Sequence, residues 1–350
     1  MKHLGFGCMR LPLLENGEVD LPHFCKMVDL FLERGYTYFD TAHGYLDGKS
    51  ELALRDGLTS RYPRDRYLLA NKLSNSYFSS EAEIRPFFAG QLEACGVTWF
   101  DYYLFHALDA EYYEKYTACR AFETVQALKA EGKVRHVGMS FHDSAAVLDR
   151  ILTDHPELEF VQLQFNYADM ESPRVQSRAC YEVCRRHGKP VFVMEPVKGG
   201  ALAQRLPAEA AAVFAALGGG SAASYALRFA AGFDGVAMVL SGMSSLDQMD
   251  DNTRFMQTVT PLNEAEQAAV AQVQEILRRQ RTIPCTACRY CTAGCPAGID
   301  IPAWFARHNA EGGPRPGGGA PADCLRCGAC ESICPQHLAI RALLEKLRQE

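Results

Sequence analysis

Two cysteine runs with the same spacing occupy the C-terminal part of the chain. They contain eight of its 14 cysteines, and each run ends in a Cys-Pro pair. Gaps of two residues let three thiolates from one loop converge on one metal centre. The other six cysteines are scattered and show no such spacing. The chain is therefore predicted to divide into a long cysteine-poor body and a short metal-binding tail.

The spacing of both runs, Cys-x2-Cys-x2-Cys-x3-Cys-Pro, is that of bacterial two-cluster ferredoxins. In that arrangement the fourth cysteine of each run binds the cluster of the other run. One predicted [4Fe–4S] cluster is held by Cys285, Cys288, Cys291 and Cys334, and the second by Cys324, Cys327, Cys330 and Cys295. Zinc is the alternative, but structural zinc sites generally use cysteine pairs separated by a longer gap. Two complete four-cysteine runs favour iron–sulfur clusters.

The composition is that of an ordinary globular protein. Hydrophobic residues make up 48% of the 350 residues and charged residues 22%, which excludes disorder of the whole chain. A net charge of -6 does not indicate the excess of basic residues by which proteins bind nucleic acid. No apolar stretch is long enough to span a membrane, and residues 1–12 lack the apolar core of a signal peptide. We therefore expect a cytoplasmic protein without nucleic-acid or membrane partners, whose clustered cysteines bind metal.

The body alternates short β-rich runs with helical patterns. Several runs are continuously apolar, as in strands buried on both faces. The predicted strands are Leu4–Cys8, Tyr36–Asp40, Tyr67–Asn71, Asp101–His106, Val134–Ser140, Phe160–Gln164, Pro190–Glu195 and Val236–Ser241. Eight strand–helix units predict an α/β fold, a (β/α)8 TIM barrel, followed by a small bacterial-ferredoxin-like domain. The rival is an open doubly wound sheet, but Gly5-Phe6-Gly7 lacks the third glycine of its nucleotide fingerprint.

The domain boundary is predicted near residues 281–284, with the barrel in residues 1–281 and the ferredoxin-like domain in residues 282–350. Asn263, with Glu266 three residues later, is expected to cap a helix that reaches about Arg281. Ala208–Ala231 is broken by Gly218–Gly220 and predicts two helices. Leu338–Leu347 has leucines at helical spacing and predicts a terminal helix.

Polar side chains stand at the carboxyl ends of the predicted strands, where barrels carry their chemistry. They are Asp40, Lys72, His106, Ser140, Gln162, Asn166, Glu195 and Ser241. Each has an ordinary structural interpretation when taken alone, such as a helix cap or a core histidine. A polar group at the same end of so many apolar strands is harder to explain by packing.

Asp40, Tyr45, Lys72 and His106 together form a chemical unit. Reduction of a carbonyl needs a proton donor for its oxygen, and the ordinary pKa of tyrosine, about 10, is high for that task. A nearby ammonium favours the phenolate, and a carboxylate positions that ammonium. A histidine can orient the carbonyl or share the proton. These residues predict reduction of a carbonyl, or oxidation of an alcohol, with Tyr45 as general acid or base.

The body resembles the aldo-keto reductase family from about Leu4 to Asn252. The stretches that carry the resemblance are Phe39–Tyr45, Ser50-Glu51, Asn71-Lys72 and Tyr102–His106. The family's Asp–Tyr–Lys–His tetrad falls on Asp40, Tyr45, Lys72 and His106. Aldo-keto reductases with a C-terminal ferredoxin form a subgroup, and the whole chain resembles a member of it. The resemblance implies a nicotinamide coenzyme, NADP or NAD, with NADP favoured.

The resemblance also implies where that coenzyme binds. Ser140 and Gln162 fall where the family contacts the carboxamide. The loop with Pro196, Lys198, Gly199 and Gly200 resembles the one near the pyrophosphate, although an ordinary turn explains its glycines equally well. Gly242, Ser244, Gln248 and Asn252 resemble the adenosine end. Relatives that prefer NADP place a basic residue where Met243, Ser244 and Ser245 stand here, so the choice of coenzyme stays open.

Three functions are compatible with this organisation. The first is a nicotinamide-dependent reductase of a small-molecule carbonyl, in which the clusters are structural or sensory. The second is an electron-transfer oxidoreductase in which single-electron clusters exchange electrons with the barrel through a flavin or an external electron carrier. The third is a redox or iron sensor that kept the barrel as a binding module. No flavin motif is recognisable, and a flavin stays open as an additional cofactor. We favour the first function.

Overall fold

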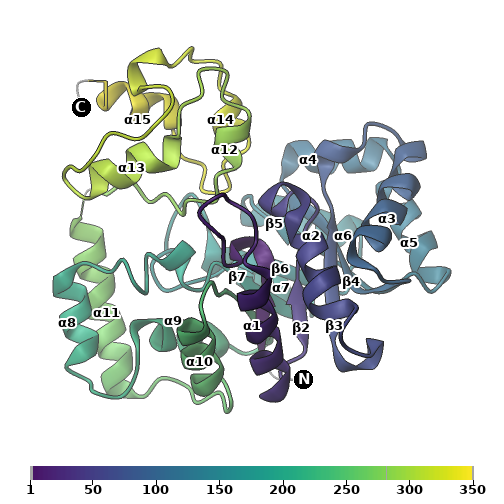
Figure 1. Ribbon diagram of the computed structural model, residues 1–350, viewed down its shortest axis with the longest axis horizontal. Helices are drawn as coiled ribbons and strands as arrows, with labels where there is room; N and C mark the ends of the chain where they lie inside the picture. The colour runs from purple at the N-terminus through teal and green to yellow at the C-terminus, as the bar shows by residue number, and fades with distance from the viewer. Residues whose placement is uncertain (1–2, 281, 349–350) are drawn as a thin grey trace.

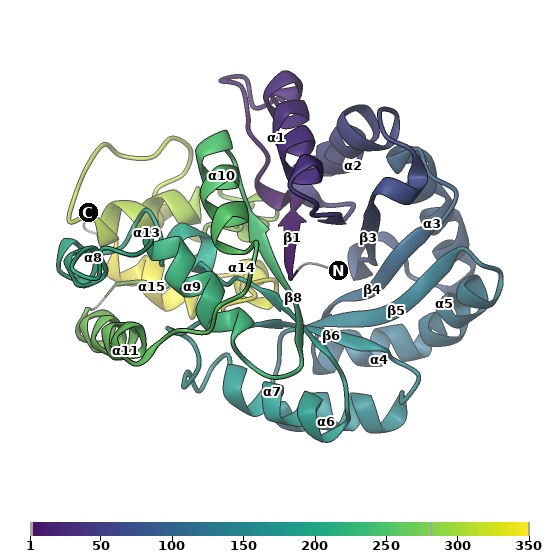
Figure 2. The ribbon, with the colours of Figure 1, turned by 90° about the horizontal axis from the view of Figure 1, so that it is seen from below.

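A closed barrel of eight parallel strands forms the body of the molecule (Figures 1 and 2). The computed structural model describes residues 3–280 and 282–348. Each strand pairs with the next in the chain, and the last pairs with the first. The strands are β1 (Leu4–Gly7), β2 (Tyr38–Asp40), β3 (Leu68–Leu73), β4 (Phe100–Leu108), β5 (Val134–Phe141), β6 (Phe160–Gln164), β7 (Val191–Met194) and β8 (Val236–Gly242). The TIM-barrel prediction is confirmed, and every predicted strand end lies within two residues of the observed one.

The barrel interior is filled at the amino ends of the strands. Tyr38, Leu104, Phe160, Phe192 and Met238 belong to one buried apolar cluster there. Gly5 on β1 makes room for this layer, because a Cβ on it would lie 2.6 Å from Leu240 and 2.8 Å from Tyr38. The packed amino end leaves the carboxyl end of the barrel as the place for a site.

Helices surround the barrel, and most pack their apolar faces on the outer side of the strands, whereas α8 and α11 pack with each other and with α9 in a separate apolar cluster. They are α1 (Leu21–Glu33), α2 (Lys49–Leu54), α3 (Glu81–Cys95), α4 (Ala110–Ala118), α5 (Ala121–Ala130), α6 (Ala145–Asp154), α7 (Ser177–Arg186), α8 (Ala208–Ala215), α9 (Ala222–Ala231), α10 (Leu246–Phe255) and α11 (Glu264–Arg279). The predicted break between α8 and α9 is confirmed. So is the cap of α11, since Asn263 and Glu266 exchange two 2.9 Å hydrogen bonds. Arg281, at the expected end of that helix, lies outside the described residues. In the described ranges, no helix has the length and apolarity needed to cross a membrane.

The tail repeats one local pattern around its two cysteine runs. In the first run Ala287 and Arg289 have positive φ, and in the second run Arg326 and Gly328 do at the same positions. A short helix follows each time, α12 (Tyr290–Ala293) and α14 (Ala329–Ser332), and then a longer one, α13 (Ile301–Asn309) and α15 (Ile340–Lys346). The last of these confirms the predicted terminal helix. Both halves share one apolar core that contains Trp304, Phe305, Ile340 and Leu344.

The tail lies on the carboxyl end of the barrel, above the strands in Figure 1. Arg10, after β1, donates through Nη2 to the carbonyl of Thr286 at 2.8 Å. Gln164, the last residue of β6, exchanges amide hydrogen bonds of 3.1 and 2.8 Å with Gln336. Hydrogen bonds at Thr286, in the first cysteine run, and at Gln336, directly after the second run, therefore hold the tail over the end of the barrel where the predicted site lies.

Candidate active site and cluster sites

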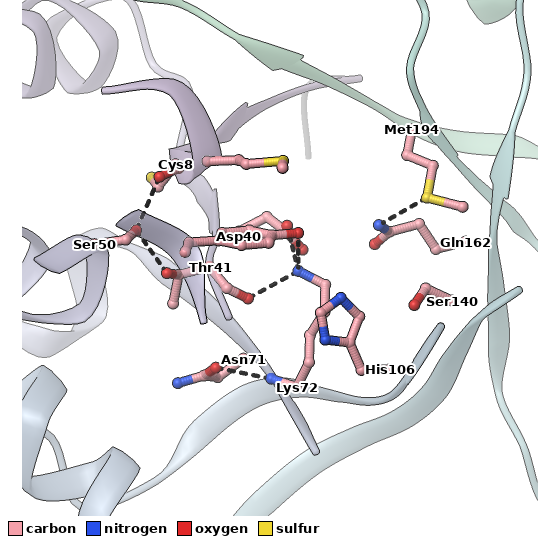
Figure 3. A network of polar contacts seen from close by, with 12 residues as sticks. Cys8, Asp40, Thr41, Ser50, Asn71, Lys72, His106, Ser140, Gln162 and Met194 are labelled. Atoms are coloured by element: carbon pink, nitrogen blue, oxygen red, sulfur yellow. Dashed lines mark hydrogen bonds and ion pairs between the residues drawn. The ribbon is translucent and has the colours of Figure 1, made fainter. Parts of the chain in front are cut away.

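Asp40, Tyr45 and Lys72 are brought into contact at the carboxyl ends of β2 and β3. The Nζ of Lys72 lies 2.6 Å from Oδ1 of Asp40 and 3.3 Å from the hydroxyl of Tyr45. A third hydrogen bond of 2.8 Å goes to the carbonyl oxygen of Thr41. Figure 3 shows the end of Lys72 beside Asp40, with the ring of His106 next to it. Three of the four predicted catalytic residues thus share one chain of hydrogen bonds, and His106 adjoins it.

Lys72 is fully buried, and its partners explain how the barrel tolerates an ammonium there. An ammonium has three N–H donors, and Asp40, Thr41 and Tyr45 supply three acceptors. The second carboxylate oxygen of Asp40, Oδ2, is buried and has no partner among the described residues. Buried charges persist in proteins when they are paired and hydrogen-bonded, as this pair is.

The sequence led us to expect that Lys72 sets the pKa of Tyr45. In the structure other groups have the larger effect on that pKa. Burial raises the pKa of Tyr45, and the charge of Asp40 raises it further. The groups that lower it are the hydroxyl of Tyr290, through a hydrogen bond, and the guanidinium of Arg10. Burial likewise raises the pKa of Asp40, against the opposing effect of Lys72.

His106 is held as a neutral ring. Burial lowers its pKa well below the ordinary value, and the positive charge of Lys72 lowers it further. The Nδ1 atom is hydrogen-bonded to the Ser74 hydroxyl at 2.6 Å. The other nitrogen, Nε2, is therefore the one that remains for a ligand, as donor or acceptor according to the tautomer.

A buried network behind the tetrad fixes its strands. The amide of Asn71 donates to Glu51 at 2.7 Å, and Gln91 donates to Asn71 at 3.0 Å. The hydroxyl of Tyr103 donates to Gln91 at 2.6 Å. Glu51 also contacts His43 at 2.6 Å. Because these bonds connect β3 and β4 with α2, α3 and the segment after β2, they position Lys72 indirectly.

Ser140 and Gln162, the predicted carboxamide contacts, are paired in register on β5 and β6. Figure 3 shows them on the opposite side of His106 from Asp40. The Ser140 hydroxyl accepts from the backbone N–H of Ala107 at 2.7 Å. The Oε1 atom of Gln162 is buried and has no partner in residues 3–280 and 282–348. An unpartnered buried acceptor fits the amide donor of a carboxamide, so this end of the barrel fits a nicotinamide.

The predicted pyrophosphate loop faces the tail. Lys198 is buried and forms an ion pair with Asp169, so its charge is already compensated. Gly199 has φ +60, and a Cβ on it would collide with the carbonyl of Thr286. Pro196 and Gly200 flank these residues in the same loop. With the tail docked, the loop does not present an open glycine surface to a pyrophosphate.

The residues predicted to bind the adenosine end of the coenzyme form hydrogen bonds mainly with nearby residues of the protein. Ser244 donates from its hydroxyl to the carbonyl of Arg10 at 2.7 Å and from its backbone to Gln248 at 2.8 Å. Asn252 donates to the hydroxyl of Ser241 at 2.9 Å and is buried. Gly242 ends β8 beside β1. These residues lie along the segment from the end of β8 into α10.

The predicted ligands of the second cluster surround one cavity. Cys295, Cys324, Cys327 and Cys330 all line a space of about 20 Å³ within the tail. This is the set expected when the fourth cysteine of the first run joins the first three of the second. Together with the softness of thiolate donors, it fits an iron–sulfur cluster. Among the residues described, no three Cys, His, Asp or Glu side chains converge as ligands of a single ion.

The predicted ligands of the first cluster adjoin the barrel. Burial raises the pKa of Cys288 to about 12, and the charges of Glu195, Cys334 and Cys285 contribute in the same direction. Cys334, from the second run, therefore lies among the thiols of the first run, as the crossed assignment requires. The backbone N–H of Ala287 donates to the sulfur of Cys285 at 3.4 Å.

Three further residues adjoin this region: Arg10 and Tyr290 were not predicted as site residues, whereas Glu195 was expected only as a polar residue at a strand end. Arg10 follows β1, and its place at the same end of the barrel was a usable signal. Glu195 directly follows β7 with a positive φ of 58, and its buried Oε2 has no partner within the described part of the chain. Tyr290 lies between two predicted cluster ligands, and nothing local in the sequence shows that it meets Tyr45. That contact depends on how the tail docks.

Comparison with known families covers both parts of the chain. Residues 3–275 match the model described as the aldo/keto reductase family. Residues 284–339 match the model of the 4Fe-4S dicluster domain. The predicted family and its ferredoxin-bearing organisation are confirmed by these two matches.

Individual relatives are more distant. A "Probable aldo-keto reductase 1" from Glycine max is 27% identical over 56% of this chain and 56% of its own. An "Aldo-keto reductase" from Gibberella moniliformis is 26% identical over 39% of this chain and 42% of its own. The chain thus spans about half the length of these curated relatives.

Solved structures resemble the barrel. A Klebsiella pneumoniae aldo-keto reductase in complex with NADPH is 19% identical, with a TM-score of 0.63 over 80% of this chain and 92% of its own. The holo form of a Bacillus halodurans aldo-keto reductase is 24% identical, with a TM-score of 0.63 over 77% of this chain and 91% of its own. At these identities the likeness establishes the fold.

Proposed function

The chain belongs to the aldo/keto reductase family, and on that premise we propose that it reduces a small-molecule carbonyl, or oxidises the alcohol, with Tyr45 as general acid or base. The observation that carries this proposal is the buried chain of contacts from Asp40 through Lys72 to Tyr45. We assign the chemistry to residues 1–281 and the clusters to residues 282–350.

In the direction of reduction, the proton of the Tyr45 hydroxyl passes to the carbonyl oxygen as the carbonyl carbon gains hydride. A nicotinamide coenzyme supplies that hydride when it is bound. Lys72 stabilises the resulting phenolate, and Asp40 compensates the charge of Lys72. The neutral ring of His106 orients the carbonyl oxygen through Nε2. Protonation of Tyr45 from solvent then completes the cycle.

The residues proposed to hold the nicotinamide are Ser140 and Gln162. The unpartnered Oε1 of Gln162 supports this assignment. We propose NADP as the coenzyme, since a structural neighbour from Klebsiella pneumoniae binds NADPH. The first basic residue after Ser244 along the chain, Arg254, forms an ion pair with Asp251 at 3.1 Å, so its charge is already compensated. Comparing the Kd values of NADPH and NADH tests this choice.

The replacement Tyr45→Phe tests the proposed reaction. General acids typically contribute about 10²- to 10⁴-fold to a rate, so kcat for every responsive carbonyl is expected to fall by that order. Tyr181→Phe is the matched control. It removes a hydroxyl that donates to the carbonyl of Asp234 at 2.8 Å, away from the tetrad, and should leave kcat unchanged. Undiminished turnover by Tyr45→Phe would contradict the proposal.

A second function is favoured by the position of the first cluster's ligands. The charge of Glu195 acts both on Cys288 in the tail and on Tyr45 in the barrel, so the two sites adjoin. A [4Fe–4S] cluster supplies or accepts single electrons when it is bound. The alternative is therefore an oxidoreductase in which the clusters exchange electrons with the barrel site, through a flavin or an external electron carrier.

Anaerobic titration of cluster-loaded protein with NADPH, and then NADH, separates the two functions. Loss of visible cluster absorbance with nucleotide alone would favour electron exchange. Loss only after a flavin is added would identify a missing cofactor. Unchanged absorbance with nucleotide bound would leave the carbonyl reductase, with the tail in a structural or sensory role.

A further inference from the structure

The loop that carries Tyr45, residues 41–51, has a strained backbone. Leu46 and Asp47 directly follow Tyr45 with φ of 52 and 54, and Gly48 continues the left-handed turn with φ of 86. Left-handed backbone is uncommon for residues other than glycine and persists where surrounding contacts impose it. The position of the Tyr45 hydroxyl therefore depends on contacts that join the two ends of this loop.

Two side-chain pairs join the ends of the Tyr45 loop. The hydroxyls of Thr41 and Ser50 lie 2.7 Å apart, and Ser50 donates to the carbonyl of Cys8 at 2.9 Å (Figure 3). Nδ1 of His43 lies 2.6 Å from Oε2 of Glu51, the residue after Ser50. The first pair consists of buried neutral hydroxyls, whereas the second joins an ionisable ring to a carboxylate. The strength of the second pair therefore changes with protonation.

Glu51 also connects this loop to the strand that carries Lys72. Its carboxylate is buried and accepts from the amides of Asn71 at 2.7 Å and Gln91 at 3.4 Å. Asn71 accepts from the backbone N–H of Lys72 at 2.8 Å, and Gln91 donates to the Lys72 carbonyl at 3.0 Å. Both backbone polar groups of Lys72 are thus bonded to side chains that Glu51 holds.

His43 is the exposed end of this buried network. Its side chain is 35% exposed and can exchange a proton with water, whereas the side chain of Glu51 is 1% exposed. Tyr77, after β3, and Phe87, in α3, pack edge-on against the ring with centroids 4.7 and 5.2 Å away. Phe87 has no charge, and burial raises the pKa of Tyr77, so its phenol is neutral as well. Since Asn71 and Gln91 are neutral amides, protonated His43 is the charged partner of Glu51 among the described residues.

We propose that protonated His43 is a positioning residue, which holds the Tyr45 loop and the strand of Lys72 together through Glu51. The two side chains that it positions meet at the centre of the tetrad, with the Lys72 ammonium 3.3 Å from the Tyr45 hydroxyl. This inference rests on the proposed carbonyl reduction. It adds a group outside the tetrad that controls how well the acid and its ammonium are placed.

The direction of the pH dependence follows from this pair. The hydrogen bond to Glu51 raises the pKa of His43, burial opposes that shift, and the charge of Glu51 adds to it. A charge-assisted hydrogen bond is about twice as strong as a neutral one. The added strength is present below the ordinary histidine pKa of about 6.5 and is lost as pH rises through the raised pKa. The buried phenol of Tyr45, whose own pKa is raised, stays protonated through this range.

The test compares kcat of the full-length, cluster-loaded protein with that of His43→Gln from about pH 6 to about pH 9. Glutamine keeps a donor for Glu51 but carries no charge. At about pH 6 we expect kcat of His43→Gln to be about threefold to tenfold lower, with KM unchanged. The ratio of the two kcat values should approach 1 as the pH rises, because His43 then loses its charge.

Three further variants show whether charge and Glu51 are responsible. His43→Lys keeps a positive charge at about pH 9 and should there exceed both the unaltered protein and His43→Gln in kcat. In a Glu51→Gln background, His43→Gln should have no further effect. His187→Gln is the matched control, because Nε2 of His187 lies 2.7 Å from Asp149 on the outer helices. It should leave kcat and its pH profile unchanged.

Hydrogen exchange tests the loop without any turnover. After correction for the intrinsic effect of pH, protection of amides in residues 42–50 should fall from about pH 6 to about pH 9 in the unaltered protein. In His43→Gln it should be low at both values. Equal protection in the two proteins would overturn the role of His43 in holding the loop.

The outcomes distinguish this inference from the reaction on which it rests. Full activity of Tyr45→Phe would overturn the proposed reaction and leave the exchange experiment intact. An inactive Tyr45→Phe beside a kcat ratio that does not change with pH would overturn only the control by His43. A His43→Lys no faster than His43→Gln at about pH 9 would also overturn it, because the charge would then have no effect.

Discussion

Lys72 shows how a single residue links the stability of the barrel to its chemistry. Its buried ammonium has three oxygen acceptors, one for each N–H group, and one of them is the buried carboxylate of Asp40. Removing either partner leaves the other as an uncompensated buried charge, which typically costs about 3–5 kcal/mol. The fold therefore depends on keeping both partners or neither, even before a substrate binds.

Replacing Lys72 with methionine separates these two roles. Lys72→Met should lower the free energy of unfolding by about 3–5 kcal/mol and abolish measurable carbonyl reduction. The double variant Lys72→Met/Asp40→Asn removes both charges and should regain part of that stability while staying inactive. Chemical denaturation and steady-state assays measure the two effects. Recovery of activity together with stability would show that Lys72 acts only as a structural residue.

His106 predicts a pH dependence of stability. Its pKa is well below 6.5 in the folded protein, because of burial and then Lys72, so the unfolded chain binds a proton that the folded chain does not. Stability from this source is present above pH 6.5 and is lost as pH falls below that value. The melting temperature should drop on acidification, and less steeply in His106→Gln. Equal slopes for both proteins would contradict the neutral ring.

At the scale of elements, the strands could be predicted from the sequence, whereas the role of the loop around Gly199 and Gly200 could not. Strands such as Val191–Met194 are buried along almost their whole length and consist only of apolar residues, so they are easily recognised. The start of α11 was predictable because its capping box is a local interaction. Gly199 and Gly200 carry the same signal whether a loop binds a phosphate or packs against another backbone. Only the docked tail distinguishes the two.

The tetrad was less predictable than the strands but more predictable than the role of this loop. Asp40, Lys72 and His106 were predictable because parallel strands of a barrel bring their carboxyl ends together. Arg10 and Tyr290 were not, since their effect on Tyr45 arises from contacts between segments far apart in the chain. The nucleotide contacts stay predictions.

Two glycines with similar backbones allow the role of the loop to be tested. Gly199 and Gly218 have φ of +60 and +66, but only Gly199 lies against the tail, at Thr286. Alanine at either position strains the backbone by about 1 kcal/mol. Gly199→Ala should in addition speed hydrogen exchange of amides in residues 283–290, whereas Gly218→Ala should not. Equal exchange in the two variants would show that the loop does not support the tail.

At the scale of the molecule, the tail covers the barrel site at the carboxyl ends of the strands. Hydrogen bonds from Thr286 and Gln336 hold it on the carboxyl ends of the strands, and the predicted cluster ligands at this junction adjoin Glu195. A coenzyme that used the loop around Gly199 would compete with the docked tail for that surface. We accordingly expect nucleotide binding and tail docking to influence each other.

The fate of a deuterium label tests the central claim most directly. Cluster-loaded protein would be mixed with a responsive carbonyl and NADPH deuterated at one or the other C4 position. We predict that one of the two coenzymes places a single deuterium on the carbinol carbon of the product, and that Tyr45→Phe abolishes this transfer. Product alcohol formed without deuterium from both coenzymes would contradict direct hydride transfer, and would show that the electrons travel through another carrier.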